Sequence, residues 1–399
     1  MITIGGFIHR KEVEDLFWRW FHGKVRESDP EYVTKLILLN NVYVSRYLNL
    51  WSRQLFSALA QSDAREVAIY TKAELKDALV SYPHYHNEHV DELIRAYVAH
   101  RERYYLETPI HGKLYFAGRG VEHRLVGTSR MKRARRLAEK SARRIIDMIF
   151  DAIKMRAQAY ADIRAKQFGI PRSQLVSSAA EMTREFERAE QRIIEDLREG
   201  ITFPKVSAPP INDVAGVKVF IERGDEDRLI EYIESRTQCE IIEKEEHNAK
   251  HYNATNLIIR ARPNKDLICA TPLETTLIER MRAKGIWLGD AQKDFESFVY
   301  SGEDDVFVEI IYSSFEDILE SEIGKSMHED RISDQRQRQE YNSHLARNIE
   351  YLVQYIFAFS SFPDKKLSEI PIKVWTRYLP DYFDEIMKNL YNAQDIDFQ

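Results

Sequence analysis

Hydrophobic positions in the first part of the chain recur at the spacing of amphipathic helices. Thr71-x-x-Glu74 has the pattern of a capping box, and Asp29-Pro30 resembles a helix N-cap followed by proline in the first turn. The pattern predicts a long helix from about Ser129 to Lys166, and we predict a helical N-terminal region over residues 1–170. One helical stripe near the start contains Val13, Leu16, Phe17 and Trp20.

The pattern changes after residue 178. Ser178-x-x-Glu181 fits a second capping box, which predicts a helix to about Arg198, and the three prolines of 201–210 end it. Four segments rich in β-branched and apolar residues follow, with helical patterns between them. These predicted strands are 216–222, 239–245, 256–262 and 305–313.

The last part of the chain returns to helical spacing. We therefore predict an α+β protein with three regions: a helical N-terminal region (1–170), an α/β domain (178–330) and a helical C-terminal extension (331–399). The α/β domain is expected to hold a mixed four- to five-stranded sheet with flanking helices. The stripe that predicts the C-terminal helix is Leu345, Ile349, Leu352, Val353 and Ile356.

Composition and charge restrict the function classes. The net charge of −6 argues against a protein that coats nucleic acid through its overall field, although a local basic face is compatible with it. Two cysteines, Cys239 and Cys269, cannot form a disulfide framework or a cysteine zinc site. We find no signal peptide, and the longest apolar run, 36–45, is too short to span a bilayer. We expect a soluble, bacterial-type cytoplasmic protein without a membrane partner.

Two acidic residues are the first candidates for chemistry. Asp213 lies at the entrance of the first predicted strand of the α/β domain, and Glu309 lies within the last one. If the two strands are neighbours, both carboxylates can face one cleft and hold Mg²⁺, which binds one or two protein carboxylates together with substrate phosphates. The alternative is that Asp213 caps a turn and Glu309 points outward from its strand.

Four sequence segments resemble the synthetase domain of the RelA/SpoT-type (p)ppGpp synthetases, a nucleotidyltransferase-like family. DVAGVKV at 213–219 is similar to the family's D-x-x-G-x-R-V, and HYNATNLII at 251–259 to its G-Y-x-S-L-H-L. VEIIYSS at 308–314 is similar to E-I-Q-x-R-T, and QRIIEDLREG at 191–200 to the helix before the linker. The resemblance covers roughly residues 180–330.

The resemblance implies roles for particular residues. Asp213 and Glu309 take the places of the metal-binding and catalytic carboxylates, and Tyr252 that of the tyrosine that stacks on the acceptor guanine. Lys218 replaces the strand arginine, and Arg188 stands where a basic residue meets the donor phosphates. The implied activity is Mg²⁺-dependent transfer of a pyrophosphoryl group between purine nucleotides, for which positioning and charge neutralisation supply most of the catalysis.

The sequence also departs from the family pattern. Asn256 and His251 replace the histidine and glycine of the second motif, and Ile311 and Ser313 replace the glutamine and arginine of the third. The helix before the linker carries six acidic residues where the family has Lys and Arg. These departures favour a transferase with another substrate, or a catalytically inactive module.

A basic stretch is the second candidate. Eight of the eighteen residues from Gly127 to Arg144 are Lys or Arg, and four of them recur every fourth residue, opposite an apolar stripe. We predict a basic helix over 129–146, capped by Thr128 or Ser129, whose face suits the phosphates of RNA or of a nucleotide. The alternative is a solvated face paired with acidic segments. The residues of this basic face are Arg130, Lys132, Arg133, Arg136, Lys140 and Arg144.

Three histidines form the third candidate. His84, His86 and His89 have a spacing that could converge on Zn²⁺, but a polar turn before a helix is the commoner role of such a segment.

Three hypotheses of function follow. The first is a diverged RelA/SpoT-like phosphotransferase or pyrophosphotransferase that acts on a nucleotide or an RNA end, with Mg²⁺ on Asp213 and Glu309. The second is a catalytically inactive domain of that fold, which contacts RNA or a protein partner through the basic helix. The third is a structural protein in which the resemblance is accidental.

Overall fold

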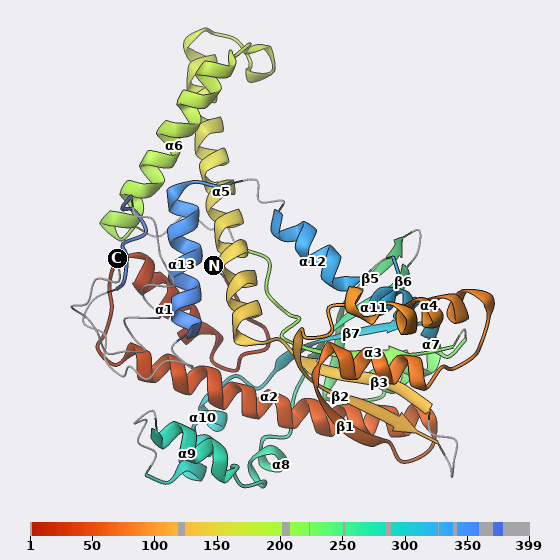
Figure 1. Ribbon diagram of the computed structural model, residues 1–399. Helices are drawn as coiled ribbons and strands as arrows, with labels where there is room; N and C mark the ends of the chain where they lie inside the picture. Colours follow the sequence, from red (N-terminus) through yellow and green to blue (C-terminus); the bar gives the residue numbers. More distant parts are fainter. Residues whose placement is uncertain are drawn as a thin grey trace.

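The computed structural model describes residues 2–118, 124–201, 208–222, 224–249, 252–283, 289–325, 327–337, 341–358 and 370–377. These segments form an α+β structure around one mixed, open sheet of seven strands (Figure 1). The strand order is β1-β2-β3-β4-β7-β6-β5. The α+β class is therefore confirmed.

All four strands predicted for the α/β domain are present. β4 and β7 run parallel in the middle of the sheet, and β6 lies antiparallel between β7 and β5. Consecutive apolar and β-branched residues form β4 because both of its faces are covered. The bounds are β4 Ala215–Phe220, β5 Cys239–Ala249, β6 Tyr252–Ala261 and β7 Val306–Ser313.

Three further strands come from the region that the sequence pattern assigned to helix. They extend the sheet from β4 as an antiparallel series. The prediction of a wholly helical N-terminal region was wrong, as was the expected size of the sheet. β3 was missed because the basic helix was predicted to begin at Ser129, which lies within this strand. The bounds are β1 Arg65–Thr71, β2 Pro109–Ala117 and β3 Arg124–Met131.

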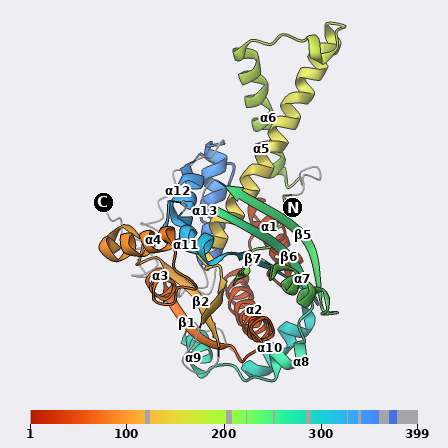
Figure 2. The same ribbon diagram turned by 90° about the vertical axis from the view of Figure 1, so that its right-hand side faces the viewer.

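The long helix α2 lies across one face of the sheet (Figures 1 and 2). Gly127 of β3 fits closely beneath it, because a Cβ at this position would lie 2.3 Å from Phe56 Cε1 and 2.4 Å from the Lys218 carbonyl oxygen. Val217 and Val219 of β4 pack into the same apolar core. The helices on this side are α2 Asp29–Ala60, α7 Glu226–Glu234, α8 Lys265–Cys269, α9 Thr275–Ala283 and α10 Ala291–Ser301.

The opposite face of the sheet is covered by shorter helices. Leu79, Phe220, Phe315 and Leu319 form part of a small apolar core there. This core leaves room for buried charges around Lys218, in the middle of the sheet. The helices on this side are α3 Lys72–Ser81, α4 Glu88–Ala99 and α11 Phe315–Ile323, and α12 His328–Gln337 follows α11.

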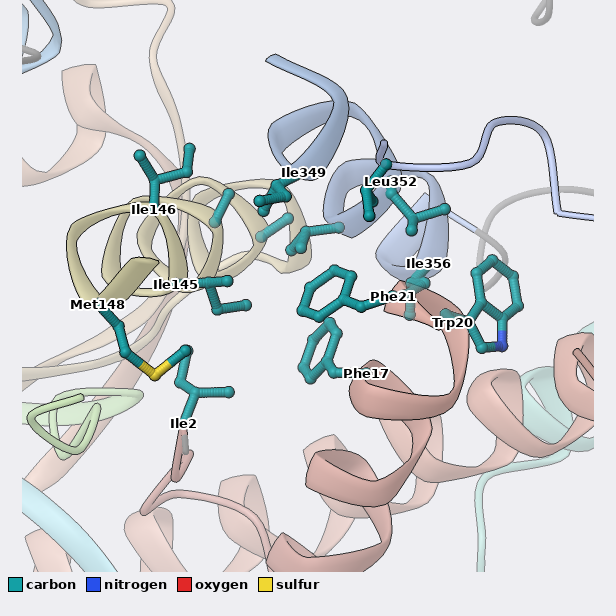
Figure 3. Close-up of a cluster of buried hydrophobic side chains, with 14 of the residues drawn as sticks. Ile2, Phe17, Trp20, Phe21, Ile145, Ile146, Met148, Ile349, Leu352 and Ile356 are labelled. Atoms are coloured by element: carbon teal, nitrogen blue, oxygen red, sulfur yellow. The ribbon is translucent and has the colours of Figure 1, made fainter. Parts of the chain in front are cut away.

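A second core belongs to a body of helices beside the sheet. Phe17 and Trp20 of α1, Ile145 of α5, and Ile349 and Leu352 of α13 meet in it (Figure 3). The apolar stripe predicted for α13 is buried and is therefore confirmed. The helices of this body are α1 Arg10–Phe21, α5 Ala134–Gln167, α6 Ala179–Glu199 and α13 His344–Ala358, and two short 3₁₀ turns lie at Arg101–Arg103 and Arg172–Gln174.

Two helix starts follow the predicted capping chemistry, and one does not. Thr71 caps α3 and Ser178 caps α6, each in a complete capping box. α2 instead begins at Asp29, after Ser28. The Asp29 carboxylate accepts hydrogen bonds from Arg19 and from the Trp20 ring nitrogen, at 2.7 and 2.8 Å, so it ties α1 to α2 rather than capping a helix.

The predicted region boundaries do not separate packing units. The boundary at 170–178 falls at the tip of the hairpin formed by α5 and α6, which projects from the body (Figure 1), and the sheet joins strands from both sides of it. The boundary at 330–331 falls inside α12. Among the described helices, none combines the length and apolar character that crossing a bilayer requires.

Candidate functional site

A row across the middle of the sheet places Arg130 and Glu309 on either side of Gly216. Arg130 of β3 pairs with Gly216 of β4, which pairs with Glu309 of β7, and directly opposed residues share one face. A Cβ at Gly216 would lie 3.5 Å from Glu309 Oε2, so the carboxylate extends over the glycine. The described residues provide no hydrogen bond or ion pair for the Arg130 side chain. The row therefore combines an acidic group with a basic group that has no partner in the described part of the chain.

Asp213 lies just before β4 and is held by two lysines. Lys132 Nζ lies 2.7 Å from Asp213 Oδ2 and 2.6 Å from the Asp213 carbonyl oxygen, and Lys140 Nζ donates to the same Oδ2. Lys132 directly follows β3, and Lys140 lies in the second turn of α5. The junction from strand to helix thus brings both ammonium groups to one carboxylate.

The charges at this site perturb one another. Burial favours the neutral form of Asp213, but the Lys132 and Lys140 ammonium groups outweigh it and lower the pKa of Asp213 well below its usual value. Burial lowers the pKa of Lys132, while Asp213 and Glu309 act in the opposite direction. Lys132 therefore lies in the field of both predicted metal-binding carboxylates.

Asn256 completes the site from β6. Its Nδ2 donates a hydrogen bond of 3.1 Å to Glu309 Oε1. Two buried oxygens, Asn256 Oδ1 and Asp213 Oδ1, have no hydrogen-bond partner among the described residues. Oxygen atoms of this kind are ligands that Mg²⁺ accepts, so the residues present fit the predicted ion. The described part of the chain has no cluster of three or more His, Cys, Asp or Glu residues that could hold a metal.

Lys218 belongs to a buried ion cluster rather than to the open site. Its Nζ lies 2.9 Å from Glu322 Oε1, and Lys72 of α3 pairs with the other oxygen of Glu322. Lys72 Nζ also lies 3.1 Å from Glu329 Oε1, and Lys76 Nζ lies 3.6 Å from Glu329 Oε2. The sequence analysis missed this cluster. The fourfold spacing of Lys72 and Lys76 on a capped helix was its only local signal, and surface helices share that pattern.

Tyr252 is remote from Glu309 along the sheet. It opens β6 opposite Ala249, whereas Glu309 pairs with Ile258 of the same strand. Six residues of extended strand separate the two backbone positions by about 20 Å. A ligand that contacts both Tyr252 and Glu309 would have to be extended along β6.

The structure does not bring Arg188 to Asp213. Arg188 lies on α6, and its guanidinium stacks 4.5 Å from the centre of the Tyr160 ring of α5. Tyr160 is twenty residues beyond Lys140 on α5, which corresponds to about 30 Å along the helix axis. Arg188 therefore stabilises the hairpin, and the prediction that places it at the donor phosphates lacks the required proximity.

The predicted basic helix begins later than expected. Arg130 lies on β3 and Lys132 lies between β3 and α5, so neither shares a helical face with the others. The helix starts at Ala134 after Arg133, without a side-chain cap. The buried stripe opposite the basic face is confirmed for Ala138, Ala142, Ile145 and Ile149. Of the remaining basic residues, Arg136 pairs with Glu139 at 2.9 Å, Arg133 is exposed and Arg144 is half-buried.

The three histidines have separate partners. His84 lies against the Leu125 carbonyl oxygen at 2.6 Å, His86 against Asp91 at 2.6 Å, and His89 against Glu320 at 3.4 Å. Burial lowers the pKa of His84 to about 4. The structure therefore places these side chains as individual polar contacts rather than as a shared set of metal ligands.

No family model, curated protein or solved structure matches the chain.

Proposed function

We propose that the chain is a RelA/SpoT-like, nucleotide-binding phosphotransferase or pyrophosphotransferase whose site lies around Asp213 and Glu309. The observation that carries the proposal is the position of Lys132, which contacts Asp213 and lies in the field of Glu309. Asp213 precedes β4, and Glu309 lies on β7, the parallel neighbour of β4. Two carboxylates next to basic side chains are what a site for a nucleotide phosphate and its cation requires.

Asp213, Glu309 and Asn256 would hold Mg²⁺, since each offers an oxygen. One oxygen of Asp213 and one of Asn256 have no hydrogen-bond partner among the residues that the structure describes. The ion would neutralise phosphate charge in the transition state. Arg130 and Lys132 would bind phosphate oxygens, with Arg130 available because the described residues do not pair it. Glu309 would orient the attacking hydroxyl and accept its proton.

A second candidate is an inactive module that binds RNA or a protein partner through the basic residues at the start of α5. The observation that favours it is the existing pairing of both carboxylates, since Asp213 is bound by two lysines and Glu309 by Asn256. The exposed Arg133 and Arg135 would supply contacts to RNA phosphates.

Calorimetric titration of ATP, GTP and GDP, with and without Mg²⁺, tests the proposal. Asp213→Asn and Glu309→Gln are the informative variants, and Glu234→Gln, an exposed carboxylate at the end of α7 on the other side of the sheet, is the control. We expect Mg²⁺-dependent binding by the wild type and the control, and a loss of at least about tenfold in either site variant.

Two results would count against the transferase. If nucleotide affinity changes neither on removal of Mg²⁺ nor in the two site variants, nucleotides bind at another site. Failure of every nucleotide to bind, together with RNA binding that Arg133→Gln and Arg135→Gln weaken, would favour the inactive module.

A further inference from the structure

The buried ion cluster contains more positive than negative charge. Its basic members are Lys72 and Lys76 of α3 and Lys218 of β4, and its acidic members are Glu322 and Glu329. All three lysines are almost completely buried, with exposed fractions of 3%, 0% and 9%. Unbalanced charge in a protein interior is costly, so this cluster has the electrostatic character of a site for an anion.

Arg130 is a further basic group near the lysines, and Glu309 lies across Gly216 from it on the same face of the sheet. Arg130 lies on the same face of the sheet as Lys218, two residues further along β3 from Thr128, which pairs with Lys218. Burial lowers the pKa of Lys218, and the charge of Arg130 lowers it further after the opposing effect of Glu322. His328 does not add charge, because burial and then Arg130 and Lys72 lower its pKa well below the usual value.

The Glu329 carboxylate makes only long contacts with the lysines around it. Neither of its carboxylate oxygens makes a hydrogen bond to a described residue, although both are buried. The buried Lys76 ammonium also has no hydrogen-bond partner in the described part of the chain, and its distance to Glu329 Oε2 is 3.6 Å. An ammonium and a carboxylate in a built ion pair approach to about 2.7–2.9 Å. Lys72 already donates a hydrogen bond to Glu322, so Lys76 is the ammonium that a group with more acceptor oxygens than a carboxylate would satisfy.

Helix α12, which carries Glu329, is lightly attached. None of its described side chains is fully buried, whereas α11 immediately before it buries seven. Besides the lysine contacts of Glu329, a hydrogen bond of 2.5 Å from the exposed Tyr105 hydroxyl to Asp330 and a contact of Arg331 hold it. Figure 1 shows α12 at the edge of the molecule between α5 and α11. Displacing α12 would expose little apolar surface.

We propose that Lys72, Lys76, Lys218 and Arg130 form a binding site for a phosphoryl group, which Glu329 of α12 fills as an internal anion. A phosphoryl group carries more negative charge and more acceptor oxygens than a carboxylate, so it replaces Glu329 and releases α12. The three lysines stay in place because α3 and β4 hold them. The three lysines lie outside the Asp213–Glu309 site, which shares only Arg130 with this one. The proposal does not depend on transfer chemistry.

Binding of inorganic phosphate and pyrophosphate, measured calorimetrically in the presence of a chelator, tests the proposal. Glu329→Gln removes the internal anion, and Asp330→Asn, on the same helix, is the matched control. We expect Glu329→Gln to bind phosphate at least about tenfold more tightly than the wild type, because the competing conformation is weakened. Asp330→Asn should match the wild type, and Lys76→Met should abolish binding.

Hydrogen exchange on the wild type gives a reading that does not depend on a variant. Phosphate should increase amide exchange over 328–334 and decrease it at the start of α3. A parallel titration with ADP separates the sources of the phosphoryl group: tighter binding of ADP than of pyrophosphate assigns the site to a nucleotide, and the reverse order assigns it to free phosphates.

The proposal is overturned if phosphate and pyrophosphate bind neither the wild type nor Glu329→Gln and leave amide exchange unchanged. It is also overturned if Asp330→Asn tightens binding as much as Glu329→Gln, because the effect would then come from loosening α12. Asp213→Asn should retain phosphate binding, so failure of the proposed nucleotide site would leave this result intact.

Discussion

At the scale of single residues, the clearest feature is Asp213 Oδ2, which pairs with the ammonium groups of both Lys132 and Lys140. Asp213 is only 17% exposed, and the two lysines are 20% and 26% exposed, so water screens these pairs incompletely. The arrangement stores a repulsion between Lys132 and Lys140 that only the carboxylate offsets. Asp213 consequently matters for stability whether or not it binds a metal.

We expect Asp213→Asn to lower the free energy of unfolding by about 2–4 kcal/mol at pH 7, because two partly buried lysines lose their counter-charge. The pKa of Asp213 is lower in the folded protein than in the unfolded chain. Its stabilising contribution is therefore complete above about pH 4, the unfolded pKa, and is lost as the pH falls further. Urea unfolding of both proteins from pH 7 to pH 3 measures this.

The difference between wild type and Asp213→Asn should be constant from pH 7 to 5 and should narrow below about pH 4. Asp304→Asn is the control, since Asp304 pairs with Lys265 at 2.7 Å but is 86% exposed and should change stability little. A difference between wild type and Asp213→Asn that grows on acidification would contradict the assignment of the two lysines as its cause.

The residue scale also shows what the sequence could and could not predict about the site. The strand patterns placed Asp213 at the entrance of one strand and Glu309 within another, and these strands, β4 and β7, are neighbours. The role of the two carboxylates stays a prediction. Their lysine and asparagine partners were not predictable, since these contacts depend on pairing between β3, β4 and β6. The Glu322 cluster was hidden for the same reason, as its members are up to 257 residues apart.

At the scale of elements, the start of α3 connects a local signal to the buried charges. Thr71 accepts a hydrogen bond from the Glu74 backbone, and Glu74 bonds back to the Thr71 backbone at 2.8 Å. Lys72 is the first residue of the helix that this box begins. The cap therefore fixes where α3 begins, and with it the positions of Lys72 and, one turn later, Lys76 in the buried ion cluster.

We expect Thr71→Ala to destabilise the protein by about 1 kcal/mol, since the α3 amides lose their capping partner. Amide exchange in the first turn of α3 should rise, and the phosphate affinity described above should fall with it. Thr71→Ser, which keeps the hydroxyl, is the matched control and should behave like the wild type. Unchanged exchange in Thr71→Ala would show that tertiary contacts alone position α3.

Element prediction succeeded where local chemistry was sufficient. The capping boxes of α3 and α6, the stripe of α13 and the four strands of the predicted α/β domain all followed from local patterns. The strands β1, β2 and β3 were not predicted from local patterns. β1 has mostly exposed residues and β3 carries Gly, Thr, Ser and basic residues, so their strand conformation depends on pairing with distant neighbours rather than on propensity.

At the scale of the whole molecule, the sheet joins the two halves of the chain. β3 pairs with β4 across the α5–α6 hairpin, and α2 covers the face of β4 and β7. A polypeptide of residues 178–399 would lose these neighbours and expose the apolar face of the sheet. We therefore expect that the predicted α/β domain, residues 178–330, does not fold independently of the rest of the chain.

We predict that residues 178–399 will not unfold cooperatively as an isolated chain. A chain in which a short turn replaces the hairpin tip, residues 162–180, should retain the cooperative transition, because most side chains in that segment are exposed. Circular dichroism during thermal unfolding and size-exclusion chromatography measure both. A cooperative transition in residues 178–399 would mean that β1–β3 are dispensable for the fold.

The geometry of α5 has a mechanical consequence. It is one continuous helix of 34 residues, gripped by the helical core between Leu137 and Ile153 and ending near the exposed Phe168. If α5 tilts as a rigid rod about Ile145, the middle of this buried section, Lys140 lies about 8 Å from the pivot and the far end of the helix about 33 Å from it. A sideways displacement of the hairpin tip would then move Lys140 by only about a quarter as much. Binding of a partner at the tip would therefore disturb the contact between Lys140 and Asp213 little.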